Sequence, residues 1–205
     1  MTNDRQDQQV GIGLLGVGAF GVYCMRAFAE LPGARFVAAA RGRKPAMRDA
    51  CRQLGAEVFD DYQAVIDHPD VDVVHLATPP AVRSEWALPA LAAGKHVLCE
   101  KPLATSEEMA RRILAAAHEA GRFCVCNFVL RYNPITDAVR RVIESGALGR
   151  LLSAEMTNLC SDSGLDADHW FWDRELSGGI FMEHGVHFFD LYLWWLGDAA
   201  VLDAG

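Results

Sequence analysis

The sequence lacks an excess of positive charge, a long apolar run and a signal-peptide pattern. It has 19 lysine and arginine residues against 27 aspartate and glutamate residues, so it carries no basic footprint for nucleic acid. No apolar run reaches the ~20 residues that span a bilayer. The amino-terminal MTNDRQDQQ is polar and does not pass from basic to apolar residues. We therefore expect a cytoplasmic protein with no nucleic-acid partner and no membrane partner.

The cysteines lack the spacing of metal or redox motifs. None of the six stands in a C-x-x-C arrangement, which is typical of zinc and thiol–disulfide sites. We expect reduced cysteines that pack as small apolar residues. Glu183, His184 and His187 could suggest a metal site, but their spacing matches no zinc motif. The sequence therefore predicts no bound metal.

Short strand patterns alternate with helical patterns over residues 1–128. The expected strands are 10–16, 35–41, 57–59, 71–77, 96–100 and 123–128. The expected helices are 19–31, 45–54, a turn at 62–67, 82–93 and a helix from the N-cap Ser106 to Ala120. Strands that alternate with helices predict a doubly wound parallel sheet. The fold class is therefore α/β, with a dinucleotide-binding Rossmann domain at residues 1–128.

The alternation stops after Phe128. A helix is expected over 134–145, a strand over 151–159, a polar loop with three aromatic residues over 160–178, and a helix from His184 to Leu196. One strand cannot form a stable sheet without partners. We therefore expect residues 129–205 to form the start of an α+β substrate domain rather than all of it. The tryptophan-rich part of the loop fits either a sugar-binding wall or packing.

GVGAFG at residues 16–21 is a G-x-G-x-x-G loop between the first strand and the first helix. Gly16 allows the tight turn, Gly18 lets the backbone approach a pyrophosphate, and Gly21 lets the helix pack on the strand. The helix start, at Ala19 and Phe20, offers free N–H groups and a positive dipole end to phosphates. These five residues predict a dinucleotide site.

The end of the second strand selects the nucleotide. An acidic residue there would accept hydrogen bonds from the ribose hydroxyls and favour NAD. This chain instead has Arg41, followed shortly by Arg43, and a guanidinium pairs well with a 2′-phosphate. The sequence favours NADP, with NAD possible. The alternative is a solvated basic turn.

Five motifs in order resemble the Gfo/Idh/MocA oxidoreductases, which include glucose–fructose oxidoreductase and inositol 2-dehydrogenase. These motifs are GVGAFG (16–21), ATPP (77–80), AGKHVLCEKPLA (93–104), RYNP (131–134) and GGIFMEHGVHFFD (178–190). The resemblance covers essentially the whole chain. It implies a Rossmann domain, a second α/β domain, and NAD(P)-dependent oxidation or reduction of sugars, cyclitols or related hydroxyl and carbonyl compounds.

The resemblance also implies roles for particular residues. Lys101 matches the lysine of the E-K-P motif that contacts substrate and helps catalysis. Glu100 and Lys101 of this motif are also expected to bind the cofactor. His187 matches the histidine that acts as general acid and base, and Glu183 takes a position where aspartate is common. The segment near the nicotinamide is matched by Thr78 and Pro79.

The implied reaction removes a hydride from a carbon and a proton from its oxygen. The nicotinamide takes the hydride, His187 takes the proton, and Lys101 stabilises charge on the same oxygen. Asp190 is expected to brace the helix or the histidine. Two alternatives stay open: a glycosidase that uses bound nicotinamide transiently, and an inactive nucleotide-binding or regulatory protein. A homo-oligomer is expected if the remaining sheet is supplied.

Overall fold

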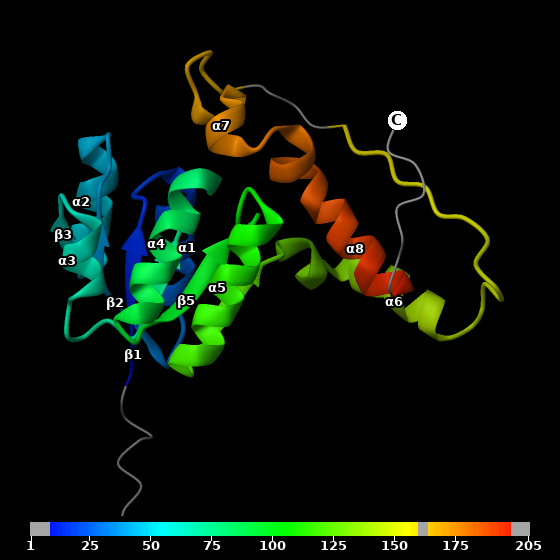
Figure 1. Cartoon of the computed structure of the whole chain (residues 1–205), viewed down its shortest axis with the longest axis horizontal. Coiled ribbons are helices and arrows are strands. Elements are labelled where there is room, and N and C mark those ends of the chain that lie inside the picture. Colours follow the sequence, from blue (N-terminus) through cyan, green and yellow to red (C-terminus); the bar gives the residue numbers. More distant parts are fainter. Residues whose placement is uncertain (1–8, 160–163, 198–205) are drawn as a thin grey trace, which may run out of the picture. The chain divides into compact units, whose positions relative to one another are not determined.

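A computed structural model describes residues 9–159 and 164–197 of the chain (Figure 1). Two compact units make up the chain, Met1–Asn127 and Phe128–Gly205. Within the described ranges, no helix combines the length and the apolar character needed to cross a membrane.

The first unit contains one six-stranded sheet in the order β3-β2-β1-β4-β5-β6. All of its strand pairs are parallel. The strands are β1 (Val10–Leu15), β2 (Ala34–Ala40), β3 (Glu57–Phe59), β4 (Val73–Leu76), β5 (His96–Glu100) and β6 (Cys124–Asn127). The order reverses between β1 and β4, and ligands of doubly wound sheets bind outside the carboxyl ends at such a reversal. The predicted α/β fold and doubly wound parallel sheet are confirmed.

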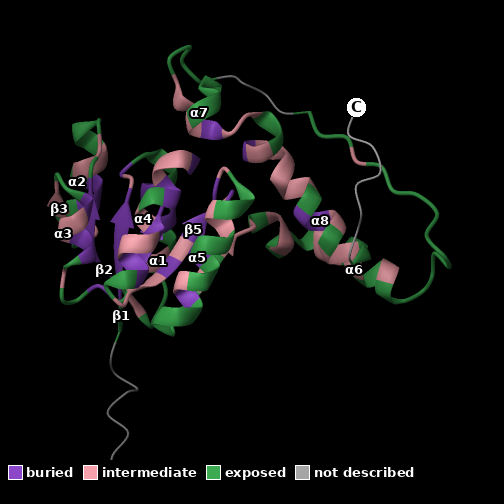
Figure 2. Cartoon of the chain, in the orientation of Figure 1, coloured by how far each residue is buried: buried purple, intermediate pink, exposed green. Residues whose placement is uncertain are grey.

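Helices cover both faces of this sheet. They are α1 (Ala19–Ala29), α2 (Pro45–Gln53), α3 (Tyr62–Ile66), α4 (Pro80–Ala92) and α5 (Glu107–Ala120). One apolar cluster lies under α1 and α2, and the other lies under α3, α4 and α5. Figure 2 shows the buried residues in purple on the strands and on the helix faces turned toward them. A sheet that is covered on both faces explains the nearly continuous apolar strands.

Local sequence signals set both ends of α5 where the sequence predicted them, whereas α1 ends two residues early and α4 begins two residues early. The Ser106 hydroxyl accepts a hydrogen bond from the Met109 N–H at 3.2 Å, which caps α5. Gly121 ends that helix with a φ of 60°, a conformation that glycine adopts without strain. The five described cysteines are free thiols, as expected, and Cys160 lies outside the described residues.

All regular structure in the described part of the second unit is helical, and the segment 151–159 is irregular. Its elements are η1 (Val129–Tyr132), α6 (Pro134–Glu144), η2 (Trp170–Trp172), α7 (Arg174–Ser177), the π turn η3 (Phe181–Gly185) and α8 (Val186–Leu196). The predicted strand 151–159 is wrong, because these residues form no strand. The apolar alternation is present, but a strand needs a partner for its backbone groups, and no described strand of this unit supplies one.

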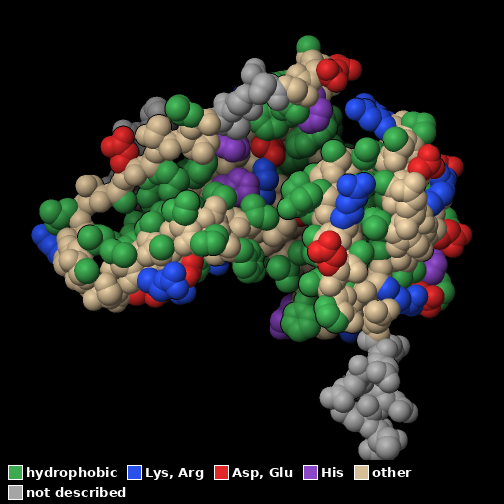
Figure 3. Space-filling model, turned by 180° about the vertical axis from the view of Figure 1, so that it is seen from behind, with side chains coloured by type: hydrophobic (Ala, Val, Ile, Leu, Met, Phe, Trp, Pro, Cys, Tyr) green, Lys and Arg blue, Asp and Glu red, His purple; other side chains and the backbone are tan. Residues whose placement is uncertain are grey.

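An apolar groove of about 530 Å³ runs along this unit. Its lining comes from α6, from the segment 148–156 and from the end of α8, including Tyr192 and Trp195. Leu152 is 80% exposed and Ile135 is 73% exposed. Figure 3 shows hydrophobic side chains gathered over much of this unit. In the described residues, this unit therefore leaves large apolar side chains of α6 and of the segment 151–159 exposed.

Candidate functional site

The glycine-rich loop joins β1 to α1 and adopts the geometry that its sequence predicts. Gly16 has a φ of 102°, and a Cβ built on it would lie 2.7 Å from the Ala77 carbonyl oxygen. A Cβ on Gly21 would lie 2.5 Å from the Gly16 carbonyl oxygen. Both distances are shorter than a carbon can tolerate against backbone oxygen. Only glycine therefore fits these two positions without moving the loop.

The start of α1 offers open space and the positive end of the helix dipole to an anion. A Cβ on Gly18 would meet no atom within 4 Å, so the backbone faces open space there. The first turn of α1 contains no acidic side chain, and no side chain caps it. The N–H groups at Ala19 and Phe20 are among the first of the helix, which have no partner within it. These residues fit the pyrophosphate of a dinucleotide.

We expect Gly21→Ala to weaken dinucleotide binding by about fivefold to a hundredfold, because the added Cβ must displace the loop and overpacking of this kind costs about 1–3 kcal/mol. The result is opposite to the usual effect of alanine, which stabilises helix interiors relative to glycine. Isothermal titration would measure the dissociation constant. Gly33→Ala is the matched control, since a Cβ there meets nothing within 4 Å. Unchanged affinity in Gly21→Ala would contradict the assigned role of the loop.

Arg41 follows the last residue of β2 and adjoins the glycine loop. Its carbonyl oxygen accepts a hydrogen bond from the Val17 N–H at 2.8 Å, and its own N–H donates to the Phe59 carbonyl at 3.2 Å. Its φ is 56°, and its guanidinium lies 4.9 Å from the centre of the Tyr62 ring. Arg43 is exposed nearby in sequence. Two cationic side chains thus follow the strand end at which a nucleotide ribose binds in this fold class.

Two more strands bring predicted residues to the same edge. Thr78 and Pro79 follow β4, and Lys101 follows β5. The carboxyl ends of parallel strands meet at one edge, so the fold gathers these residues on the side of the sheet that holds the glycine loop. Thr78 is buried, whereas Lys101 is half-buried.

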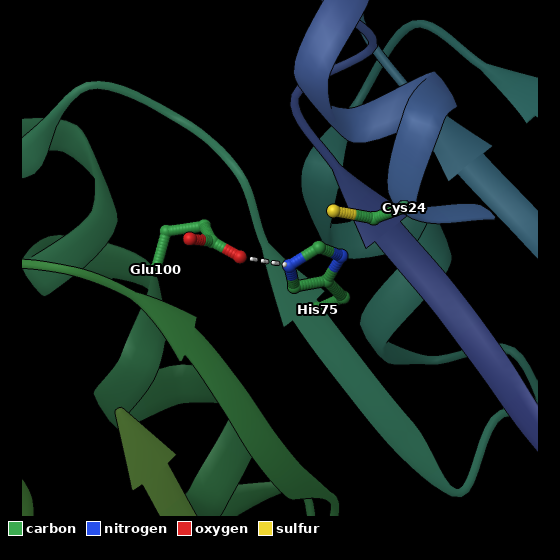
Figure 4. A group of neighbouring side chains, drawn as sticks. All are labelled: Cys24, His75 and Glu100. Atoms are coloured by element: carbon green, nitrogen blue, oxygen red, sulfur yellow. Dashed lines mark hydrogen bonds and ion pairs between the residues drawn. The ribbon is translucent and has the colours of Figure 1, made fainter. Parts of the chain in front are cut away.

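Glu100 belongs to this edge, but its carboxylate is turned inward. Its Oε1 atom lies 3.0 Å from His75 Nε2 and accepts a hydrogen bond from Asn127 Nδ2 at 2.9 Å. Figure 4 shows the imidazole between Glu100 and Cys24. The side chain of Glu100 therefore holds the ends of β4, β5 and β6 together. Any contribution to a cofactor would come through its backbone or through the placement of Lys101.

Cys24, His75 and Glu100 are the described residues whose potential ligand atoms come within 4.8 Å of one another. Burial, helped by the charge of Glu100, raises the pKa of the Cys24 thiol to about 12. A metal ligand must be a thiolate, and the same burial makes the thiolate of Cys24 costly to form. Packing and the hydrogen bonds of the carboxylate account for the cluster, so we assign no metal to it.

The second unit carries the other predicted catalytic residues. Glu183 lies in the π turn η3 and is buried, and His187 lies half-buried in the first turn of α8. The imidazole of His184 has its ring centre 6.1 Å from that of His187, and its Nε2 atom lies 3.0 Å from Asn158 Oδ1. The sequence predicted one helix from His184 to Leu196. In the structure a wider π turn over Phe181–Gly185 precedes α8, and such turns are frequent at functional sites.

Asp190 braces α8, as the sequence predicted. Its two carboxylate oxygens accept hydrogen bonds from Arg131 at 2.8 and 2.6 Å. The hydrogen bond to Asp190 raises the pKa of the Arg131 guanidinium. The guanidiniums of Arg131 and Arg140 lie 5.7 and 5.0 Å from the ring of Trp194. The RYNP arginine thus fixes η1 to the helix that carries His187.

We expect Asp190→Asn to lower the free energy of unfolding by about 1–3 kcal/mol, because it breaks a charged, two-pronged pair and leaves a buried polar group poorly matched. Urea unfolding followed by tryptophan fluorescence would measure the change. Asp137→Asn is the control, since its pairs with Arg140 and Arg141 lie on the surface of α6 and are worth less than about 1 kcal/mol. Equal effects of the two substitutions would argue against a bracing role.

The parallel sheet with a glycine-rich loop at its topological reversal defines a dinucleotide-binding Rossmann domain. A family model described as "Oxidoreductase family, NAD-binding Rossmann fold" (GFO_IDH_MocA) matches residues 10–128, and the GFO/IDH/MocA C-terminal domain matches residues 136–204. The chain therefore belongs to the Gfo/Idh/MocA oxidoreductase family, as its motifs predicted.

Relatives with named activities are similar over nearly all of the chain. Levoglucosan dehydrogenase of Pseudarthrobacter phenanthrenivorans is 30% identical over 96% of this chain and 54% of its own length. Inositol 2-dehydrogenase 2 of Saccharopolyspora erythraea is 34% identical over 94% of this chain and 55% of its own. The crystal structure of KijD10, a 3-ketoreductase from Actinomadura kijaniata in complex with NADP and TDP-benzene, is 27% identical with a TM-score of 0.81, covering 93% of this chain and 58% of that one. The chain thus spans about half the length of the curated relatives it matches.

Proposed function

We propose that the protein is an NAD(P)-dependent oxidoreductase for a sugar, a cyclitol or a related hydroxyl or carbonyl compound. The observation that carries the proposal is the shared sheet edge, where the glycine loop, Thr78 with Pro79, and Lys101 follow neighbouring strands. The names of the relatives support the substrate class. Two are dehydrogenases, named for levoglucosan and for inositol, and the third is a 3-ketoreductase. When bound, the nicotinamide supplies hydride transfer.

In this proposal three side chains act on the substrate. His187 takes the proton of the reacting hydroxyl, or returns it to a carbonyl in the reverse direction. The ammonium of Lys101 hydrogen-bonds the same oxygen and stabilises its developing charge. Glu183, buried and four residues before His187, orients the substrate or the imidazole. Lys101 belongs to the first unit and the other two to the second, so their meeting at one substrate is part of the proposal.

We further propose NADP as the preferred cofactor, with Arg41 and Arg43 binding the 2′-phosphate of the adenosine ribose. The support is the position of Arg41, whose backbone is hydrogen-bonded to the glycine loop through Val17. Lys44 precedes α2 and adds a third positive charge to this turn. The crystal structure of KijD10 contains NADP, whereas the family description names NAD, so the choice rests on these side chains.

The remaining proposals concern the whole protein. We propose residues 1–128 as the dinucleotide-binding domain and 129–205 as part of the substrate domain. A homo-oligomer and a cytoplasmic location complete the proposal.

Titration of the full chain with NADPH and NADH tests the cofactor, and a panel of polyols, sugars and carbonyl compounds tests the activity. A dehydrogenase changes the reduced-nicotinamide absorbance in proportion to product. A glycosidase of the same fold would recycle its cofactor with no net change. Failure to bind either dinucleotide would overturn the proposed function.

A further inference from the structure

We propose that Arg83 is a positioning residue that locks together the two loops of the nicotinamide side of the site. This inference rests on the proposed function. Arg83 lies in the first turn of α4 and is only 4% exposed. Its Nη1 atom donates to the carbonyl oxygens of Glu100 at 2.8 Å and Pro102 at 2.7 Å. Its Nη2 atom donates to the carbonyl oxygen of Thr78 at 2.5 Å.

The three carbonyls belong to the two segments that carry predicted site residues. The pairing of β4 with β5 ends at Leu76 and Cys99, so no strand ladder holds these two segments together beyond that point. Arg83 supplies the connection there, with one nitrogen on the loop after β4 and the other on the loop after β5. The guanidinium thus extends the contact between the β4 and β5 segments beyond the point where the sheet stops.

Lys101 is held on both sides by this arrangement. The carbonyls of Glu100 and Pro102 precede and follow it in sequence, and both accept hydrogen bonds from the same nitrogen of Arg83. The backbone from which the lysine side chain extends is therefore fixed relative to Thr78. Arg83 does not need to touch substrate or cofactor to set the distance between the nicotinamide segment and the catalytic lysine.

The chemistry of arginine suits this position. A guanidinium is planar and presents its donors in a fixed fork, so one side chain can serve several carbonyls from different segments. A hydrogen bond to a charged group contributes about 1.5–3 kcal/mol net, which favours a defined loop geometry over alternatives. Lysine carries the same charge as a flexible point and cannot reproduce the fork.

The test compares two ligands of the full chain, NADPH and adenosine 2′,5′-bisphosphate, which lacks the nicotinamide half. We expect Arg83→Met to weaken NADPH binding about tenfold, the effect of roughly 1.4 kcal/mol, and to leave adenosine 2′,5′-bisphosphate within about twofold. Arg83→Lys is expected to lie between wild type and Arg83→Met. Arg122→Met is the matched control, because Arg122 also donates to a carbonyl, that of Gly94, but lies away from this edge and should change neither affinity.

The second measurement needs no ligand. In Arg83→Lys, amide hydrogen exchange should be about tenfold faster at the non-proline residues of 77–80 and 100–104, with residues 16–21 unchanged. If Arg83→Met does not fold, Arg83→Lys decides by both measurements. The proposal is overturned if both ligands bind the variants as they bind wild type, if both weaken equally, or if exchange in the two loops is unchanged. Wild-type protein that binds neither ligand would instead overturn the proposed function, and the exchange result would still test Arg83.

Discussion

His187→Ala is expected to lower kcat by about 10²–10⁴-fold, the usual contribution of a positioned proton-transfer group. The imidazole lies in the first turn of α8, which the Arg131–Asp190 pair holds in place. We expect the substitution to leave α8 folded and to remove the group proposed to accept the proton. The measurement is steady-state turnover with the best substrate of the panel, followed by the reduced-nicotinamide absorbance.

His184→Ala is the control for this prediction. Its ring is close to that of His187 in the same segment, but its Nε2 atom is engaged with Asn158 Oδ1. We expect a change of less than about tenfold in kcat for His184→Ala and no loss of NADPH affinity for either variant. Turnover of His187→Ala within tenfold of wild type would remove His187 from the mechanism and leave Lys101 and Glu183 as the remaining candidates.

Arg41→Asp is expected to reverse the cofactor preference. Loss of hydrogen bonds between guanidinium and phosphate, at about 1.5–3 kcal/mol each, should weaken NADPH binding about tenfold to a hundredfold or more. The new carboxylate repels the 2′-phosphate and can accept hydrogen bonds from the ribose hydroxyls of NADH. Aspartate suits the left-handed backbone at this position, where Arg41 has a φ of 56°, better than most residues.

Arg35→Asp controls for the change in net charge. Arg35 lies near the start of β2, at the opposite end of the strand, and pairs with Asp70 at 3.5 Å on the surface. The substitution changes the net charge by the same amount but should leave the NADPH to NADH ratio unaltered. A ratio of affinities near one in the wild type, or unchanged in Arg41→Asp, would contradict the assignment of NADP.

Much of the first unit was predictable because its signals are local. The glycine loop and the stop at Gly121 depend on conformations that few residues adopt, and the cap at Ser106 depends on a side-chain oxygen that few residues carry. Alternating strands and helices then leave few topologies. The placement of the site residues that follow strand ends could be predicted from that topology, since the carboxyl ends of parallel strands share an edge.

Other features depend on contacts far apart in sequence. Nothing local marks Arg83 as a partner of three carbonyls, although its spacing to Ala87 and Ala90 places it on the buried face of α4. The inward turn of Glu100 toward His75 and Asn127 depends on the sheet order. The strand predicted at 151–159 had a local signal that misled. Its alternating pattern is real, but pairing requires a second strand.

A crystal structure of the chain with NADP⁺ and inositol tests the central claim most directly. The account predicts the pyrophosphate on the loop 16–21 and the 2′-phosphate beside Arg41. It also predicts that Lys101 Nζ and the imidazole of His187 both lie within about 2.6–3.2 Å of one substrate oxygen. A dinucleotide bound elsewhere, or an imidazole turned away from the nicotinamide, would contradict it.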